Sequence, residues 1–197
     1  HGHHRRQRQM CIRDSLGTLL AGEREDWIIC TKVGESFADG KSTHDFSPEA
    51  CLASIDRSLQ RLRTDVLDIV LIHSDGSDED ILQRWGTLQA LQTAKEAGKA
   101  RAVGISHKSV IGAQLALEQG ADVIMATLNP EYLEDQTIIA QAAAQGCGVL
   151  IKKAFSSGHG RASDLAFVAS QEGVHSIVVG TTSSEHLREN VAQVLSV

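Results

Sequence analysis

Residues 66–74 read Val-Leu-Asp-Ile-Val-Leu-Ile-His-Ser, an almost continuous aliphatic run that ends in a histidine. A short apolar run rich in Val and Ile is typical of a strand buried on both faces, as in a parallel sheet. His73 stands where this strand meets the following loop. In α/β proteins, sites are built at the carboxyl ends of parallel strands. The stretch therefore predicts an α/β fold and marks His73 as a candidate functional residue.

The residues upstream of this strand follow the same plan. Trp27–Val33 is apolar and predicts a first strand, with Lys32 near its end. Glu35–Phe46 is polar and predicts a loop. Ser47-Pro48-Glu49 predicts the start of a helix, with an N-cap serine, a proline in the first turn and an acid near the positive end of the helix dipole.

Downstream, strands and helices alternate. Ile81–Ala97 predicts one helix, with Trp85 on its inward face between apolar neighbours. A glycine then ends a helix and precedes a strand four times, at Gly98, Gly120, Gly146 and Gly173, before the predicted strands Ala100–Ile105, Asp122–Leu128, Cys147–Ile151 and His175–Val179. This alternation indicates βαβ units and a parallel sheet.

About six βα units can be counted, which is two fewer than a (β/α)8 TIM barrel has. Ser15–Gly22 resembles the last turns of a helix whose preceding strand is absent. We therefore expect a (β/α)8 barrel that lacks its first two βα units, with about six parallel strands alternating with helices. The alternative is an open doubly wound sheet, although no GxGxxG motif follows any strand, so its usual dinucleotide-binding form lacks support.

The N-terminal segment differs in composition from the rest. His1–Asp14 contains four Arg and one Asp, in a chain of 197 residues with a net charge of −6. The contrast suggests a tag, a disordered basic arm, or translated foreign sequence joined to a truncated gene, and the last is favoured. We expect a foreign or disordered arm over residues 1–14 and a partial barrel over residues 15–197.

Composition narrows the classes of function. The acidic balance gives no sign of a nucleic-acid partner, and no apolar run approaches the roughly 20 residues that span a membrane. The four cysteines (Cys11, Cys30, Cys51 and Cys147) have no CxxC spacing, which favours reduced thiols in the cytoplasm. No histidine cluster has partner ligands at zinc-site spacing, so no metal site is predicted.

Two groups of residues could carry chemistry. Lys32 and His73 end neighbouring strands, where a cation and an imidazole can polarise a carbonyl; alternatively, Lys32 is a solvated lysine and His73 a capped, half-buried histidine. Val179–Ser184 is a strand, a glycine turn and a set of hydroxyls that open the last helix. Such a helix N-terminus can bind an anion, or its hydroxyls can simply cap the helix.

Four segments together make a family resemblance specific. Cys30–Gly34, Asp68–His73, Gly98–Ser106 and Val179–Asn190 resemble segments of the aldo-keto reductases, in that family's order and at its approximate spacing. The resemblance covers residues 15–197, the last six of the family's eight barrel units.

The resemblance implies NAD(P)H-dependent reduction of aldehydes or ketones to alcohols, with a small-molecule carbonyl substrate and neither nucleic acid nor membrane as a partner. Lys32 matches the catalytic lysine and His73 the histidine that orients the carbonyl. Ser106 matches a residue that holds the nicotinamide carboxamide, and His107 replaces the asparagine that usually follows it. The residues that match the grip on the adenosine phosphates and adenine are Gly180, Thr181, Thr182, Ser183, His186, Glu189 and Asn190. NADP(H) is expected rather than NAD(H).

One departure bears on activity. The family's proton-donating tyrosine and its partner aspartate belong to a segment ahead of Ser15, and the only tyrosine here is Tyr132, on a different loop. We therefore expect an oxidoreductase of this family that is inactive as this chain. The alternative is a non-catalytic nucleotide-binding barrel module, and a third possibility is an unrelated phosphate-binding barrel.

Overall fold

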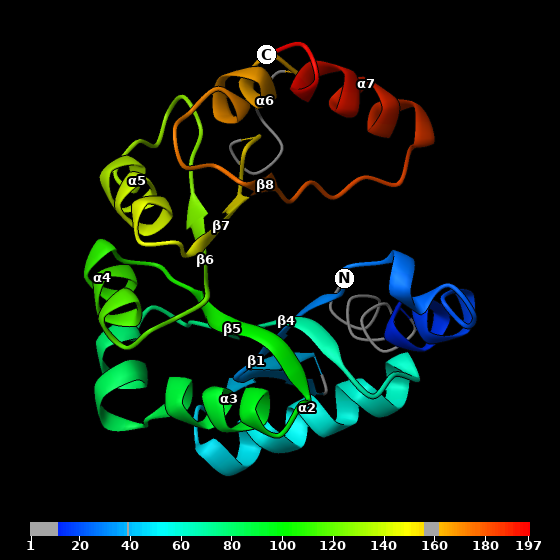
Figure 1. The fold of residues 1–197 in the computed structure, drawn as a ribbon, viewed down its shortest axis with the longest axis vertical. Helices are drawn as coiled ribbons and strands as arrows, with labels where there is room; N and C mark the ends of the chain where they lie inside the picture. Colours follow the sequence, from blue (N-terminus) through cyan, green and yellow to red (C-terminus); the bar gives the residue numbers. More distant parts are fainter. Residues whose placement is uncertain (1–11, 39, 156–161) are drawn as a thin grey trace. The chain divides into compact units, whose positions relative to one another are not determined.

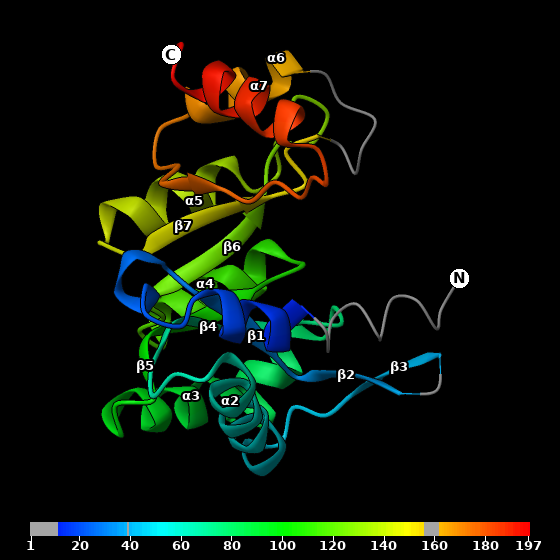
Figure 2. The same cartoon turned by 90° about the vertical axis from the view of Figure 1, so that its right-hand side faces the viewer.

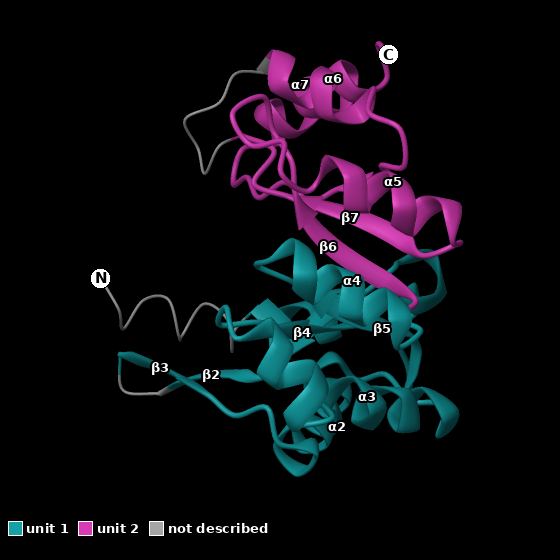
Figure 3. Ribbon diagram, turned by 90° about the vertical axis from the view of Figure 1, so that its left-hand side faces the viewer, with its two compact units in different colours: residues 1–121 teal, residues 122–197 magenta. Residues whose placement is uncertain are grey.

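The computed structural model describes residues 12–38, 40–155 and 162–197. The chain divides into two compact units, residues 1–121 and 122–197 (Figure 3). Each unit contains three parallel strands with helices between them. The predicted α/β class, with six parallel strands alternating with helices, is confirmed.

The first unit is built on parallel strands in the order β1–β4–β5, which are Cys30–Val33, Leu67–His73 and Ala100–Ser106. Its helices are α2 (Pro48–Leu62), α3 (Thr87–Glu96) and α4 (Val110–Glu118), with a short 3-10 helix η1 (Arg24–Asp26) and a π-helical turn η2 (Asp80–Arg84). Figure 1 shows α2 and α3 lying along one side of these strands.

The strand register decides which side chains share a face of this sheet. Lys32 lies opposite Leu71, and His73 lies opposite Ser106. Because side chains alternate between the two faces and paired residues share a face, Lys32, His73 and Ser106 lie on the same one. The opposite face carries the fully buried aliphatic residues Val33, Val70, Ile72, Val103 and Ile105. This apolar face is the one that the helices cover.

Helix α2 begins as its sequence predicts. The Ser47 hydroxyl accepts a hydrogen bond from the Ala50 amide, and Pro48 occupies the first turn. Its buried residues Cys51, Ile55 and Leu62 recur at helical spacing, so a single face packs inward. The helix ends at Leu62, and the next residue, Arg63, adopts a left-handed conformation.

The segment between β1 and α2 is a hairpin, so its prediction as a loop was wrong. Strands β2 (Glu35–Ala38) and β3 (Lys41–His44) pair antiparallel and extend from the end of β1 (Figure 2). All four residues of β3 are exposed. A hairpin that buries neither of its faces in the core lacks the apolar alternation by which a strand is recognised in a sequence.

The prediction of a single helix over Ile81–Ala97 was also wrong. The segment forms η2, then turns at Gly86, which has φ +65°, and continues as α3. A left-handed residue cannot continue a right-handed helix, so the chain changes direction there. Trp85, expected on the inward face, is instead 46% exposed.

The described residues include only the last part of the N-terminal arm. Residues 1–11 lie outside the described residues, while 12–19 are helical and Gly22 follows with φ +94°. The expected helix end near Gly22 is therefore present. The assignment of residues 1–14 to a foreign or disordered arm stays a prediction.

The second unit contains β6 (Val123–Thr127), β7 (Gly148–Lys152), β8 (Ser176–Ile177), α5 (Gln136–Ala144), α6 (Ala162–Ala169) and α7 (Ser184–Val194). Strands β6 and β7 pair along five positions, whereas β8 pairs with β7 at only two. The strand predicted over His175–Val179 is therefore much shorter than expected. Helix α7 buries none of its residues. Across both units, no described helix has the length and apolar character to cross a membrane.

Asp78 links the loops that follow β4 and β5. Its Oδ2 accepts hydrogen bonds from the Lys108 amide at 3.0 Å, the Ser109 amide at 2.7 Å and the Ser109 hydroxyl at 2.7 Å. Burial opposes ionisation of this carboxyl, but these bonds and one with Ser74 outweigh it and lower its pKa. Gly112 packs directly against Asp78, and a Cβ there would overlap the carboxylate side chain.

We predict that Gly112→Ala destabilises the chain by about 1–3 kcal/mol, as overpacking does, with a fall of several degrees in the thermal midpoint. The added methyl group must displace either α4 or Asp78. Gly180→Ala is the matched control, since a Cβ at Gly180 meets no atom within 4 Å. Circular dichroism melts of both variants make the measurement, and equal midpoints would contradict the packing argument.

Candidate active site

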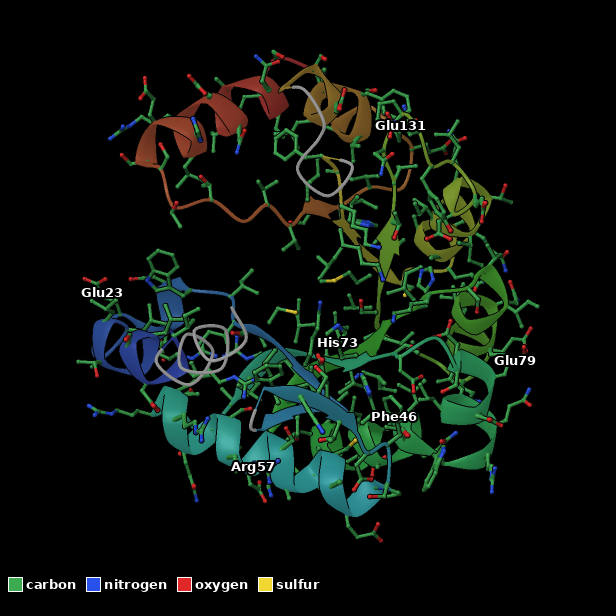
Figure 4. All side chains as sticks on the ribbon, turned by 180° about the vertical axis from the view of Figure 1, so that it is seen from behind. Glu23, Phe46, Arg57, His73, Glu79 and Glu131 are labelled. Atoms are coloured by element: carbon green, nitrogen blue, oxygen red, sulfur yellow. The ribbon has the colours of Figure 1, made fainter. Side chains whose placement is uncertain are left out.

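The carboxyl ends of β1, β4 and β5 bring together three of the predicted site residues. Lys32 is half-buried, the His73 side chain is 40% exposed, and Ser106 is buried. Figure 4 labels His73 at the end of its strand. A cation, an imidazole and a hydroxyl on one face form a group that can hold and polarise a small polar ligand.

Glu35 contacts His73 and was not identified from the sequence. Its Oε2 lies 2.7 Å from His73 Nδ1, and its Oε1 accepts a hydrogen bond from the Ser42 hydroxyl at 2.6 Å. Partial burial raises the pKa of Glu35, but the Ser42 bond and the charges of His73 and His44 outweigh it, so the net shift is downward. The one signal in the sequence was an acid three residues after Lys32, at a strand end.

Burial changes the acidity of Lys32. Desolvation lowers its pKa from the ordinary value of 10.5, and the charges of Cys30 and Glu35 oppose this only in part. Lys32 is therefore only partly solvated. An ammonium that is poorly hydrated interacts more strongly with a nearby oxygen than one in bulk water does.

The residues after β4 and β5 differ in exposure. Ser106 and His107 are both buried, with 3% and 1% of their surfaces exposed. Ser106 lies opposite His73 in the register, which places its hydroxyl at the same end of the sheet. Their contacts with a nicotinamide remain predictions.

The second unit holds the other predicted cofactor residues at the start of α7. Gly180, Thr181, Thr182, His186 and Glu189 are exposed, whereas Ser183 and Asn190 are half-buried. The Thr181 hydroxyl accepts a hydrogen bond from the Ser183 amide at 3.1 Å, and the Ser183 hydroxyl accepts one from the His186 amide at 3.3 Å. The capping role that the sequence left open is therefore present, and anion binding stays a prediction.

Metal ligation has no geometric support in the described ranges: no group of three His, Cys, Asp or Glu side chains there could hold an ion.

Comparison with known proteins identifies the family. A sequence model described as "Aldo/keto reductase family" matches residues 9–162, more than half of the chain. The chain belongs to the aldo/keto reductase family. The resemblance inferred from four short segments is thereby confirmed.

Curated relatives of this aldo/keto reductase are oxidoreductases. It is 41% identical over 85 residues to L-galactose dehydrogenase from Arabidopsis thaliana, an alignment that covers 42% of this chain and 25% of that protein. It is 31% identical over 128 residues to methylglyoxal reductase DkgB from Escherichia coli O157:H7, covering 62% of this chain and 44% of that protein. The aligned regions thus span less than half of these relatives.

Solved structures confirm the fold. A putative aldo-keto reductase from Pseudomonas aeruginosa is 41% identical with a TM-score of 0.89, covering 94% of this chain and 73% of that one. An aldo-keto reductase from Bacillus halodurans in its holo form has a TM-score of 0.83 at 22% identity, covering 95% of this chain and 74% of that one, which shows the fold alone. The alternating strands and helices are those of a partial (β/α) barrel.

We predict that Lys32→Met raises the thermal midpoint at pH 7 by a few degrees, because methionine removes the desolvated charge but keeps the length of the side chain. A lysine whose folded-state pKa is depressed destabilises the fold below its unfolded-state value of 10.5. The gain should therefore shrink as the pH approaches that value.

Melts at pH 7 and near pH 10.5 make the comparison, with Lys108→Met, at an exposed lysine, as the control. A midpoint that falls in Lys32→Met at pH 7 would refute the assignment of a desolvation cost to Lys32.

Proposed function

We propose that this aldo/keto reductase has the NAD(P)H-dependent carbonyl-reducing function of its family, with a small aldehyde or ketone as substrate. The observation that carries the proposal is the common face of Lys32, His73 and Ser106 at the ends of three adjacent parallel strands. Sites in such folds are built at the carboxyl ends of strands. The three free thiols described, Cys30, Cys51 and Cys147, support a place in the cytoplasm.

Each residue on this face has a separate role in the proposal. The Lys32 ammonium and the His73 imidazole stabilise negative charge that develops on the carbonyl oxygen. Ser106 and His107 hold the carboxamide of the nicotinamide. When bound, the dinucleotide supplies the hydride.

The start of α7 has features that suit the nucleotide's phosphates. Its first amide groups and exposed hydroxyls lie at the positive end of an 11-residue helix, and the space beside Gly180 is open. Thr181, Thr182 and Ser183 would contact phosphate, and Glu189 and Asn190 the adenosine. His186 in the first turn favours NADP(H) over NAD(H), since an imidazole N–H can donate a hydrogen bond to an additional phosphate.

A second candidate function is nucleotide binding without turnover by the 197 residues alone. Their one tyrosine, Tyr132, follows β6 in the second unit. Desolvation, aided by the nearby Asp135 and Glu134, raises its pKa to about 12, so it is a weak proton donor at neutral pH. The raised pKa of Tyr132 therefore favours nucleotide binding without turnover over catalysis by these 197 residues.

We predict that saturating NADPH raises the thermal midpoint of the chain by several degrees. A ligand at 100 times its Kd adds about 2.7 kcal/mol to the free energy of unfolding. Thr182→Glu should abolish this rise without changing the unliganded midpoint, because a carboxylate repels the phosphates at an exposed position. Ala192→Glu, which adds the same charge near the other end of α7, should preserve it. An unshifted wild-type midpoint would overturn nucleotide binding.

The two candidate functions differ in turnover: the binding-module candidate predicts that the 197 residues show no aldehyde-dependent NADPH oxidation above the blank, whereas the carbonyl-reducing function predicts turnover. Absorbance at the nicotinamide band measures this directly. Turnover that is present in the wild type and lost in Lys32→Met would contradict the binding-module candidate and establish Lys32 as catalytic.

A further inference from the structure

The hairpin that follows β1 brings a carboxylate to the end of β4. Glu35 is the first residue of β2, and it pairs with His44 in the antiparallel register. Ser42 lies two residues before His44 and therefore on the same hairpin face, where its hydroxyl donates to Glu35 Oε1 at 2.6 Å. Glu35 is thus held by its own hairpin while its other oxygen reaches His73.

The contact between Glu35 and His73 requires a proton on Nδ1 of the imidazole. Oε2 lies 2.7 Å from Nδ1, so the carboxylate accepts the Nδ1 proton. A neutral imidazole protonated at Nδ1 has an Nε2 that can only accept a hydrogen bond, whereas the doubly protonated ring donates from Nε2. A neighbouring carboxylate favours the doubly protonated ring. At 40% and 26% exposure, solvent screens the pair only partly.

Lys32 adds a second positive charge on this face. Its two electrostatic partners are Cys30 from β1 and Glu35 from β2, while Glu35 in turn is influenced by His73 from β4 and His44 from β3. A protonated Lys32 near the end of the neighbouring strand disfavours a positive charge on His73. Glu35 is the anion that offsets this repulsion, since its charge acts on Lys32 and its oxygen contacts His73.

We propose that Glu35 is a positioning residue that holds His73 in the doubly protonated form, so that Nε2–H donates to the oxygen of a carbonyl ligand. The ligand's oxygen would then meet two hydrogen-bond donors, the Lys32 ammonium and His73 Nε2–H, because Nε2 is no longer an acceptor. The ligand's identity rests on the proposed function. The protonation state of His73 does not, and it can be measured on the chain alone.

The test is a pH titration of His73 in the uniformly 15N-labelled chain, followed by long-range 1H–15N correlation of the imidazole nitrogens. Glu35→Gln should weaken proton binding to His73 by about tenfold, because it removes the charge but retains the shape. Glu35→Asp should recover part of the loss. Ser42→Ala keeps the charge but releases the carboxylate, and should give a smaller loss.

Glu79→Gln is the matched control, since it makes the same charge change at an exposed helical position just before η2, apart from His73 in Figure 4. It should leave the His73 titration unchanged. A His73 midpoint in Glu35→Gln equal to that of the wild type would overturn the proposal. If Glu35→Gln fails to fold, an unaltered midpoint in both Glu35→Asp and Ser42→Ala would overturn it equally.

The failure of this inference can be told apart from that of the proposed function. A His73 titration that depends on Glu35 in a chain that does not respond to NADPH would uphold the Glu35 assignment and refute nucleotide binding. A thermal midpoint that rises with NADPH, together with a His73 titration that is the same with and without Glu35, would support nucleotide binding and refute the Glu35 assignment.

Discussion

The parallel register of β1, β4 and β5 is the constraint on which the fold and the site of the first unit both depend. Side chains in a strand alternate with a period of two, so a slip of one residue exchanges its two faces. The face with Val70, Ile72 and Val103 is fully buried beneath helices, and such a slip would place His73 there instead. Burial of aliphatic side chains therefore fixes the register, and the register places His73 beside Lys32 and Ser106. Selection for a stable core thus also maintains the arrangement of the site.

The amino end of β4 makes stabilising contacts, whereas its carboxyl end carries candidate site residues. At the amino end, Asp68 accepts hydrogen bonds from Arg24 at 2.7 Å and the Ile29 amide at 2.8 Å, and lies 3.1 Å from Arg101. These contacts satisfy a buried carboxylate and tie η1 and the neighbouring strands to β4. At the carboxyl end, His73 is only half-buried and is paired with a carboxylate from a hairpin. The Asp68 contacts hold the amino end of β4 in place. The carboxyl end can therefore carry His73 and Glu35, whose charged forms are costly to desolvate, without being needed to anchor the strand.

Sequence patterns predicted the elements that have apolar periodicity or capping residues, and missed the hairpin, which has neither. Strand β4 and helix α2 have apolar periodicity and capping residues, so both were predicted close to their observed bounds. The hairpin β2–β3 has little apolar periodicity, and Glu35 and His73 are 38 positions apart in the chain, so no local pattern indicates their contact. Gly86 interrupts the helix because its backbone is left-handed. A single glycine within an apolar repeat does not indicate whether its backbone will be left-handed, so the interruption could not be predicted. The role proposed for Lys32 came from family resemblance, while its partial burial is visible only in the folded chain.

At the start of α7, the two interpretations that the sequence left open do not exclude each other. The hydroxyls of Thr181 and Ser183 accept backbone amide protons, which caps the helix. A hydroxyl that accepts a hydrogen bond still has a proton to donate, and a phosphate oxygen requires a donor. Capping also holds these side chains in place before any ligand arrives, so less conformational freedom is lost on binding. The Thr181 hydroxyl also donates to the Ser183 carbonyl at 3.4 Å, so these contacts fix its orientation, while the Ser183 hydroxyl, which accepts from the His186 amide, has a proton that it can donate to an anion at the start of α7.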